Sequence, residues 1–115
     1  MKRIIIPVLT MVAVAGCSAP KDEATDVAQQ ACIADKNSDV DSMSDYMSAE
    51  MFEQNKMMHE SADPQLKKML KMLNCDVKNT EELEDGSFVV SFKKHNSYEI
   101  KEVNGDFKVV GEQYF

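Results

Sequence analysis

The sequence predicts an α+β domain in which about three N-terminal helices pack on an antiparallel meander of three to four strands. Between residues 22 and 74, apolar side chains recur at three- and four-residue steps, which is the period of a helix. After residue 75 they alternate with polar ones, which is the period of a strand. Helices followed by strands along the chain are typical of an α+β domain.

Three helices are expected in the first part of the mature chain. The first covers residues 22–35, and the polar run Lys36-Asn37-Ser38 interrupts it. Ser38 or Asp39 can cap the second helix. One face of that second helix should carry Val40, Met43, Met47 and Met51.

The third helix has the clearest predicted ends. Asp63 is a favourable N-cap, Pro64 suits the first helical position, and Asn74 can close the helix. Its apolar stripe, which we expect to be buried, consists of Leu66, Met69, Leu70 and Leu73.

The strands are expected at residues 75–78, 88–92, 98–103 and 107–110. Asn104-Gly105 is the strongest hairpin signal, because both residues tolerate positive φ, and it predicts that Ile100 pairs with Val109 and Glu102 with Phe107. A loop centred on His95 would place Phe92 opposite Tyr98 and Val90 opposite Ile100. The sheet face that the helices must cover is then Phe88, Val90, Phe92, Tyr98, Ile100, Phe107 and Val109.

The first sixteen residues have the pattern of an export signal. Lys2 and Arg3 precede an apolar stretch, 4–15, that is too short to span a bilayer, which takes roughly 20 apolar residues. Ala13-Val14-Ala15 would suit ordinary signal peptidase. Val14-Ala15-Gly16-Cys17 instead resembles the lipobox of bacterial lipoproteins, and we prefer this interpretation because the cysteine stands at the end of the apolar stretch.

The lipoprotein resemblance implies how the chain is processed and where it lies. Residues 1–16 would be removed as the signal peptide, and Cys17 would become the first residue and carry lipid. Residues 17–22 would form a lipidated tether, and residues 23–115 a single domain. Ser18, in place of an aspartate, implies the outer membrane with the domain facing the periplasm, and the cell surface is left open. Several acyl chains anchor a protein stably, so the lipid on Cys17 is the expected membrane contact.

The order of elements from about Asp22 to Phe115 also resembles small lipoproteins of the nuclear-transport-factor-like, or cystatin-like, roll. The likeness depends on a helix, the break and second helix in "NSDVDSMSDYMS", a further helix, and the final strand pair ending in "NGDFKVV". It implies a small cystatin-like roll. Because that family has both catalytic and binding members, the fold would leave the function open.

The charge of the chain excludes some partners and suggests one. The mature chain would lose Lys2 and Arg3, leaving 11 basic against 20 acidic residues, a net charge of −9. This balance speaks against nucleic acid and against electrostatic binding to anionic lipid. The acidic half is residues 17–64, which could face a basic envelope protein or be an ordinary solvated surface.

The cysteines predict one disulfide. Cys17 is consumed by lipidation, so Cys32 and Cys75 have a single possible pairing in an oxidising compartment. The alternative is two buried free thiols, because cysteine also packs as a small apolar residue.

No pattern for metal binding or catalysis stands out. Met57-Met58-His59 raises the possibility of Cu(I), but the methionines fall mostly on stripes that should be buried, so no metal or other cofactor is expected. His59 and His95 are interpreted as polar surface residues, and no catalytic motif accompanies them. Glu81, Glu82, Glu84 and Asp85 are interpreted as a solvated acidic loop rather than a calcium site.

Three functions therefore remain open at the level of sequence. The leading one is a non-catalytic binding or envelope-accessory role. The second is a small-molecule-binding or enzymatic roll, and the third is an acidic inhibitor of a basic wall-degrading hydrolase. A pocket lined by converging polar groups would favour the second class, and a filled core would favour the first or the third.

Overall fold

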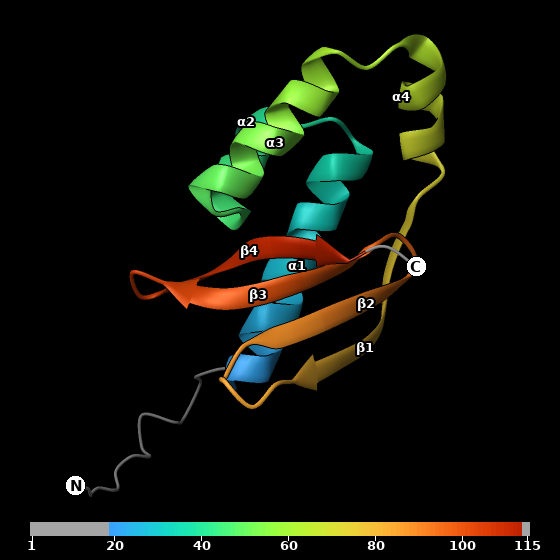
Figure 1. Ribbon diagram of the computed structural model, residues 1–115. Helices are drawn as coiled ribbons and strands as arrows, with labels where there is room; N and C mark the ends of the chain where they lie inside the picture. Colours follow the sequence, from blue (N-terminus) through green and yellow to red (C-terminus); the bar gives the residue numbers. More distant parts are fainter. Residues whose placement is uncertain (1–18, 114–115) are drawn as a thin grey trace, which may run out of the picture.

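The computed structural model describes residues 19–113, so the predicted signal peptide and Cys17 lie outside the described residues. The predicted α+β class is confirmed, with four helices in place of about three (Figure 1). The elements are α1(Pro20–Lys36), α2(Val40–Tyr46), α3(Ala49–Glu60), α4(Pro64–Lys71), β1(Asn74–Glu82), β2(Phe88–Lys94), β3(Ser97–Val103) and β4(Asp106–Gln113).

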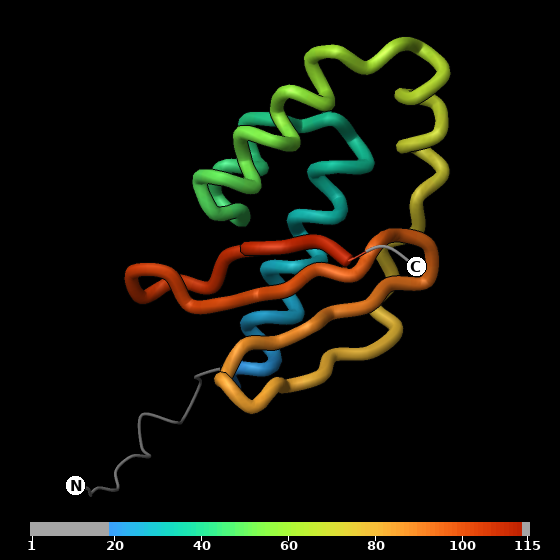
Figure 2. The backbone as a smooth tube through the Cα atoms, viewed as in Figure 1, coloured from blue at the N-terminus to red at the C-terminus, as the bar shows by residue number. Residues whose placement is uncertain are grey.

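The four strands form one antiparallel sheet in the order β1-β2-β3-β4, and α1 crosses one of its faces (Figures 1 and 2). Every residue of the predicted covered face is buried except Phe107, which is half-buried. The α1 side of this core is built from alanines and one cysteine, whose small side chains let the helix lie close to the sheet: Ala24, Ala28, Ala31, Cys32 and Ala34.

The predicted second helix is two helices. Its stripe continues through Met43, Met47 and Met51, all buried, but the backbone is extended at Met47. Met47 forms a β-bridge with Val109, and the Ser48 N–H donates to the Val109 carbonyl at 2.9 Å. Ser48 then caps α3 by accepting from the Met51 N–H. The helix breaks because contact with the edge of the sheet satisfies the backbone groups that the break exposes.

The predicted start of α4 is confirmed, but its predicted stripe is partly wrong. Asp63 accepts from the Leu66 N–H at 2.8 Å, and Pro64 is the first helical residue. The helix ends at Lys71 rather than near Asn74, and Leu70 is its buried residue. Met69 is 58% exposed, because α4 stands beside the other helices at the end of the molecule away from the N-terminus (Figure 1).

The register of the last hairpin is confirmed and that of the preceding one is wrong. Ile100 pairs with Val109 and Glu102 with Phe107, across the positive-φ turn at Asn104-Gly105. Between β2 and β3, however, Tyr98 lies opposite Val90 instead of Phe92. The difference is two residues, so the same side chains still face the helices. The changed register accompanies an inward turn of His95, whereas the sequence predicts this residue at an exposed loop tip.

The first strand is longer than predicted. It runs from Asn74 to Glu82, so Glu81 and Glu82 belong to β1, and the remaining turn is organised by Asp85, whose carboxylate accepts from the backbone N–H and the hydroxyl of Ser87. All four acidic residues of the expected loop are exposed, including Glu84.

Cys32 and Cys75 lie at disulfide distance, as the cysteine count predicts. Their sulfur atoms are 2.09 Å apart and their Cα atoms 5.7 Å apart, within the range that disulfides require. The bridge joins α1 to the first strand. It lies three residues before Asp35, at the helix end that forms the site described next.

Candidate functional site

Asp35 is a buried carboxylate in the last turn of α1. It follows Ala28, Ala31 and Cys32 at helical spacings of seven, four and three residues, so it continues the face that packs on the core. The residue is 5% exposed. A carboxylate buried to this degree requires hydrogen-bond partners.

Two histidines supply those partners. His59 Nε2, from the last turn of α3, lies 2.6 Å from Oδ1 of Asp35, and His95 Nε2, from the turn between β2 and β3, lies 2.8 Å from Oδ2. The two imidazole side chains are 2% and 3% exposed. The interpretation of both histidines as polar surface residues is therefore wrong. We call this group of three residues the Asp35 cluster.

The hydrogen bonds of His95 favour its protonated, cationic form. Its Nδ1 lies 2.7 Å from the Asn96 carbonyl, which can only accept, and its Nε2 donates to the carboxylate of Asp35. Burial by itself would lower the pKa of His95. The hydrogen bonds to Asp35 and Asn96, together with the charges of Asp35 and Glu112, outweigh burial and raise the pKa above its usual 6.5.

The surroundings of the two imidazoles differ. His95 stacks edge-on against Phe92 and Tyr98, and the Tyr98 hydroxyl lies 3.3 Å from its Nε2. Burial, followed by the charges of Asp35 and Glu112, raises the pKa of Tyr98 well above 10, so the phenol stays neutral. His59 donates from Nε2 to Asp35, and its Nδ1 is the one buried side-chain nitrogen or oxygen of residues 19–113 without a hydrogen-bond partner.

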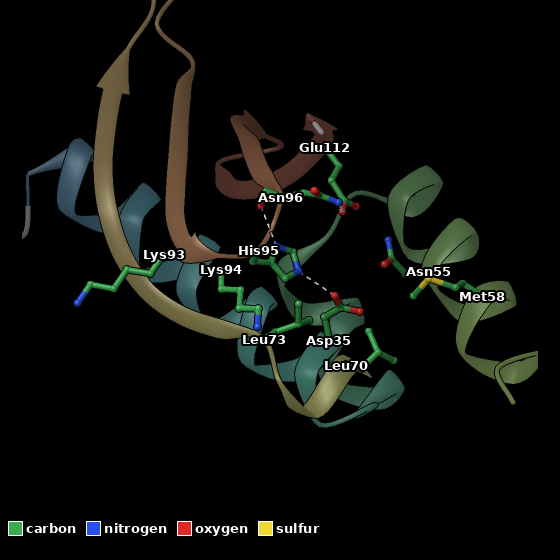
Figure 3. A pocket seen from close by; sticks show the side chains of 10 residues that line it. All are labelled: Asp35, Asn55, Met58, Leu70, Leu73, Lys93, Lys94, His95, Asn96 and Glu112. Carbon is green, nitrogen blue, oxygen red and sulfur yellow. Dashed lines mark hydrogen bonds and ion pairs between the residues drawn. The ribbon is translucent and has the colours of Figure 1, made fainter. Parts of the chain in front are cut away.

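A cleft of about 490 Å³ opens beside Asp35 and His95 (Figure 3). Its volume lies within the range of small-molecule sites. The lining residues come from α1, α3, the end of α4, β2, the β2–β3 turn and β4, and they are Asp35, Asn55, Met58, Leu70, Leu73, Lys93, Lys94, His95, Asn96 and Glu112. We call it the Asp35 cleft.

The Asp35 cleft combines an apolar wall with polar groups already held in place. Met58, Leu70 and Leu73 form the apolar part. Among the polar groups, Asn96 donates from Nδ2 to Glu112 at 2.8 Å. This hydrogen bond and those of the Asp35 cluster orient the polar side chains before any ligand arrives. Such preorganisation favours binding.

The described residues hold no group of three or more His, Cys, Asp or Glu side chains that could bind a metal ion. The two imidazole Nε2 atoms face different oxygens of one carboxylate at hydrogen-bonding distance, instead of converging on a common centre. The side chains of Met57 and His59, from the sequence cluster Met57-Met58-His59, also lie in different surroundings. Met57 is 68% exposed, whereas His59 is buried against Asp35.

Sequence reasoning missed the Asp35 cluster, although one signal for it was present. Asp35 continues the buried face of α1, and His59 follows Met51 and Asn55 at steps of four on the buried face of α3. Polar residues on an otherwise apolar helical face are candidates for a buried site. No comparable signal marks His95, since it lies in a turn.

Compared with protein-family models, curated proteins and solved structures, the chain has no match. Within the described residues, none of the helices has the length and apolar character needed to cross a membrane.

Proposed function

We propose that this protein is a lipid-anchored binding protein of the bacterial envelope that holds a small molecule in the Asp35 cleft. The lipobox at Val14-Ala15-Gly16-Cys17 supports the lipid anchor, and Ser18 supports the outer membrane. The domain would face the periplasm. The observation that carries the binding role is the cleft itself, in which an apolar wall meets polar groups from α1, α3 and the β2–β3 turn.

The bonding of the cluster favours binding over catalysis. Both ring nitrogens of His95 and both carboxylate oxygens of Asp35 are engaged in hydrogen bonds within the protein. The remaining ring nitrogen of the cluster, Nδ1 of His59, has no hydrogen-bond partner among the described residues, but it is buried and His59 does not line the cleft. A general base or nucleophile needs a free atom directed at the substrate. The cluster instead resembles a rigid support for the floor of a binding site.

The cleft supports one of the functions that the sequence left open. A cleft lined by converging polar groups favours a small-molecule ligand over a role based on the acidic surface alone. We therefore prefer a small-molecule-binding roll without catalysis to an acidic inhibitor of a basic hydrolase.

The test uses the chain from Ser18 to Phe115, which contains every helix and strand of the structure. Because this chain lacks the lipid-bearing Cys17, it needs no detergent, which would compete with the probes for the cleft. Three probes with the same eight-carbon chain, octanoate, octan-1-ol and octylammonium, are titrated while amide chemical shifts are followed by NMR. At least one probe is expected to give saturable shifts centred on Asn55, Met58 and His95.

A pair of neighbouring substitutions locates the binding. Leu73→Trp fills the cleft from its apolar wall and should abolish the shifts, whereas Met72→Trp, at a 64% exposed position outside the cleft, should leave them unchanged. Binding of none of the three probes, or shifts that persist in Leu73→Trp, would contradict the proposed function.

A further inference from the structure

The charged groups around the Asp35 cleft differ in how far the protein itself neutralises them. Each oxygen of Asp35 lies within hydrogen-bonding distance of an imidazole, and one of these is His95, whose protonated form the cluster favours. Its negative charge is therefore compensated inside the cluster. Glu112 accepts a hydrogen bond from Asn96, and its charge helps to raise the pKa of His95.

The two lysines at the end of β2 are not equivalent. Lys93 lies 3.9 Å from a carboxylate oxygen of Asp76, and its side chain points away from the cleft (Figure 3). Lys94 lines the cleft, points toward the side where Leu73 lies, and forms no ion pair with any described residue. Lys94 is thus the cation of the cleft whose charge is available to a ligand.

The position of this charge relates it to the apolar wall. Lys94 and the leucine side chains lie toward one side of the cleft, while Glu112 lies across His95 and Asn96 from them (Figure 3). A ligand whose apolar part rests on Leu70 and Leu73 would therefore present its end group to Lys94 rather than to Glu112. An anionic end group would form a charge-assisted hydrogen bond there, and a cationic one would be repelled.

We infer that the ligand of the Asp35 cleft is an amphipathic organic anion whose charged group binds Lys94. This inference rests on the proposed function and adds the chemical class of the ligand to it. Asn55 adds a second polar contact that would contribute to the specificity of the cleft for its ligand. It is 7% exposed and donates from Nδ2 to the Met51 carbonyl, which leaves its side-chain oxygen as an acceptor for a hydroxyl or amide N–H of the ligand.

The experiment compares the affinities of the three eight-carbon probes for the same chain from Ser18 to Phe115. Octanoate should bind about tenfold or more tightly than octylammonium, the range expected for one hydrogen bond to a charged group, with octan-1-ol between them. Equal affinities, or tighter binding of the cation, would overturn the anionic class while leaving the proposed function intact. If none of the three probes binds, both the proposed function and the anionic class of the ligand are wrong.

Two charge reversals assign the preference to one residue. Lys94→Glu should weaken octanoate binding about tenfold or more and strengthen octylammonium binding, and Lys78→Glu, on β1 outside the cleft, should change neither by more than about twofold. Because both lysines are exposed strand residues, the two variants are matched in net charge and similar in their effect on the fold. If Lys78→Glu has the same effect as Lys94→Glu, the ligand senses only the overall charge and Lys94 is not its site.

Discussion

Oδ2 of Asp35 lies 2.8 Å from Nε2 of His95, although 60 residues separate them in the chain. This hydrogen bond joins the end of the first helix to the turn that connects the two central strands, β2 and β3. The second oxygen of the same carboxylate holds α3 through His59. One buried side chain thus ties three distant segments together beside the cleft, and its removal should be felt by the whole domain.

Replacing Asp35 by Asn should destabilise the protein strongly. The substitution removes the counter-charge of a buried imidazolium, and breaking a buried pair from one side costs about 3–5 kcal/mol. Urea unfolding of the variant and the wild type measures the loss. Asp26→Asn, at an exposed position of the same helix, is the control and should stay within about 0.5 kcal/mol. A similar small change for Asp35→Asn would show that the cluster does not hold the fold.

Stability should decrease as the pH rises above 6.5. The folded protein binds the proton of His95 more tightly than the unfolded chain does, because the pKa of His95 is raised. The stabilisation is therefore complete below pH 6.5 and is lost as the pH rises through the folded pKa. The free energy of unfolding, measured between pH 6 and 9, should fall in the wild type and fall less in His95→Gln.

The unfolding measurements stop at pH 9 so that the ionisation of tyrosine does not contribute to the change in stability. The raised pKa of Tyr98 adds a loss of stability of the same sign, but only near and above pH 10, where the unfolded phenol ionises. The titration of the His95 ring by NMR gives an independent measurement, with a midpoint above 6.5 that Asp35→Asn should lower. A midpoint at or below 6.5 in the wild type would show that the cluster does not raise the pKa of His95.

The disulfide should contribute a large part of the stability. Cys32 and Cys75 are 43 residues apart, and closing a loop of this length is worth ~4 kcal/mol in the chain-entropy model, which is an upper figure. Protein taken from the periplasm should show no free thiol under denaturing conditions, and reduction should lower its Tm markedly. Two titratable thiols in the denatured protein would refute the bridge.

The lipid anchor has its own test. Cys17→Ala should abolish incorporation of radiolabelled palmitate and cause the precursor to accumulate, because no thiol remains to accept the lipid. Wild-type protein labelled in parallel is the control. Palmitate that is still incorporated into Cys17→Ala, or a mature chain that begins at Gly16, would show that the lipobox assignment is wrong.

Copper should bind no more tightly than to a methionine-poor protein of similar size. The Nε2 of His59 is hydrogen-bonded to Asp35, and the Met57 side chain is exposed whereas this imidazole is buried. A competition assay for Cu(I) measures the affinity of the chain from Ser18 to Phe115. Tight, stoichiometric binding that is lost when Met57 and Met58 are both replaced by Leu would show that a copper site exists.

Much of the fold follows from short-range patterns. Asp63 and Pro64 set the start of α4 because capping is a local hydrogen bond, and Asn104-Gly105 sets the register of β3 with β4 because its positive φ angles define the turn. The pairing of Cys32 with Cys75 follows from counting. The alternation of β2 to β4 identifies the buried sheet face, and this holds even where the register of β2 was predicted two residues out.

The sequence by itself determined the order of elements, the last hairpin, the buried face and the pairing of the cysteines. Only the tertiary structure decided that Met47 leaves the helix to meet Val109, that Met69 stays exposed, and that His59 and His95 meet at Asp35. The physical reason is the distance along the chain over which each kind of interaction acts. Helical periodicity, caps and turns depend on residues within about four positions, whereas the partner of a buried polar group depends on how the helices dock on the sheet.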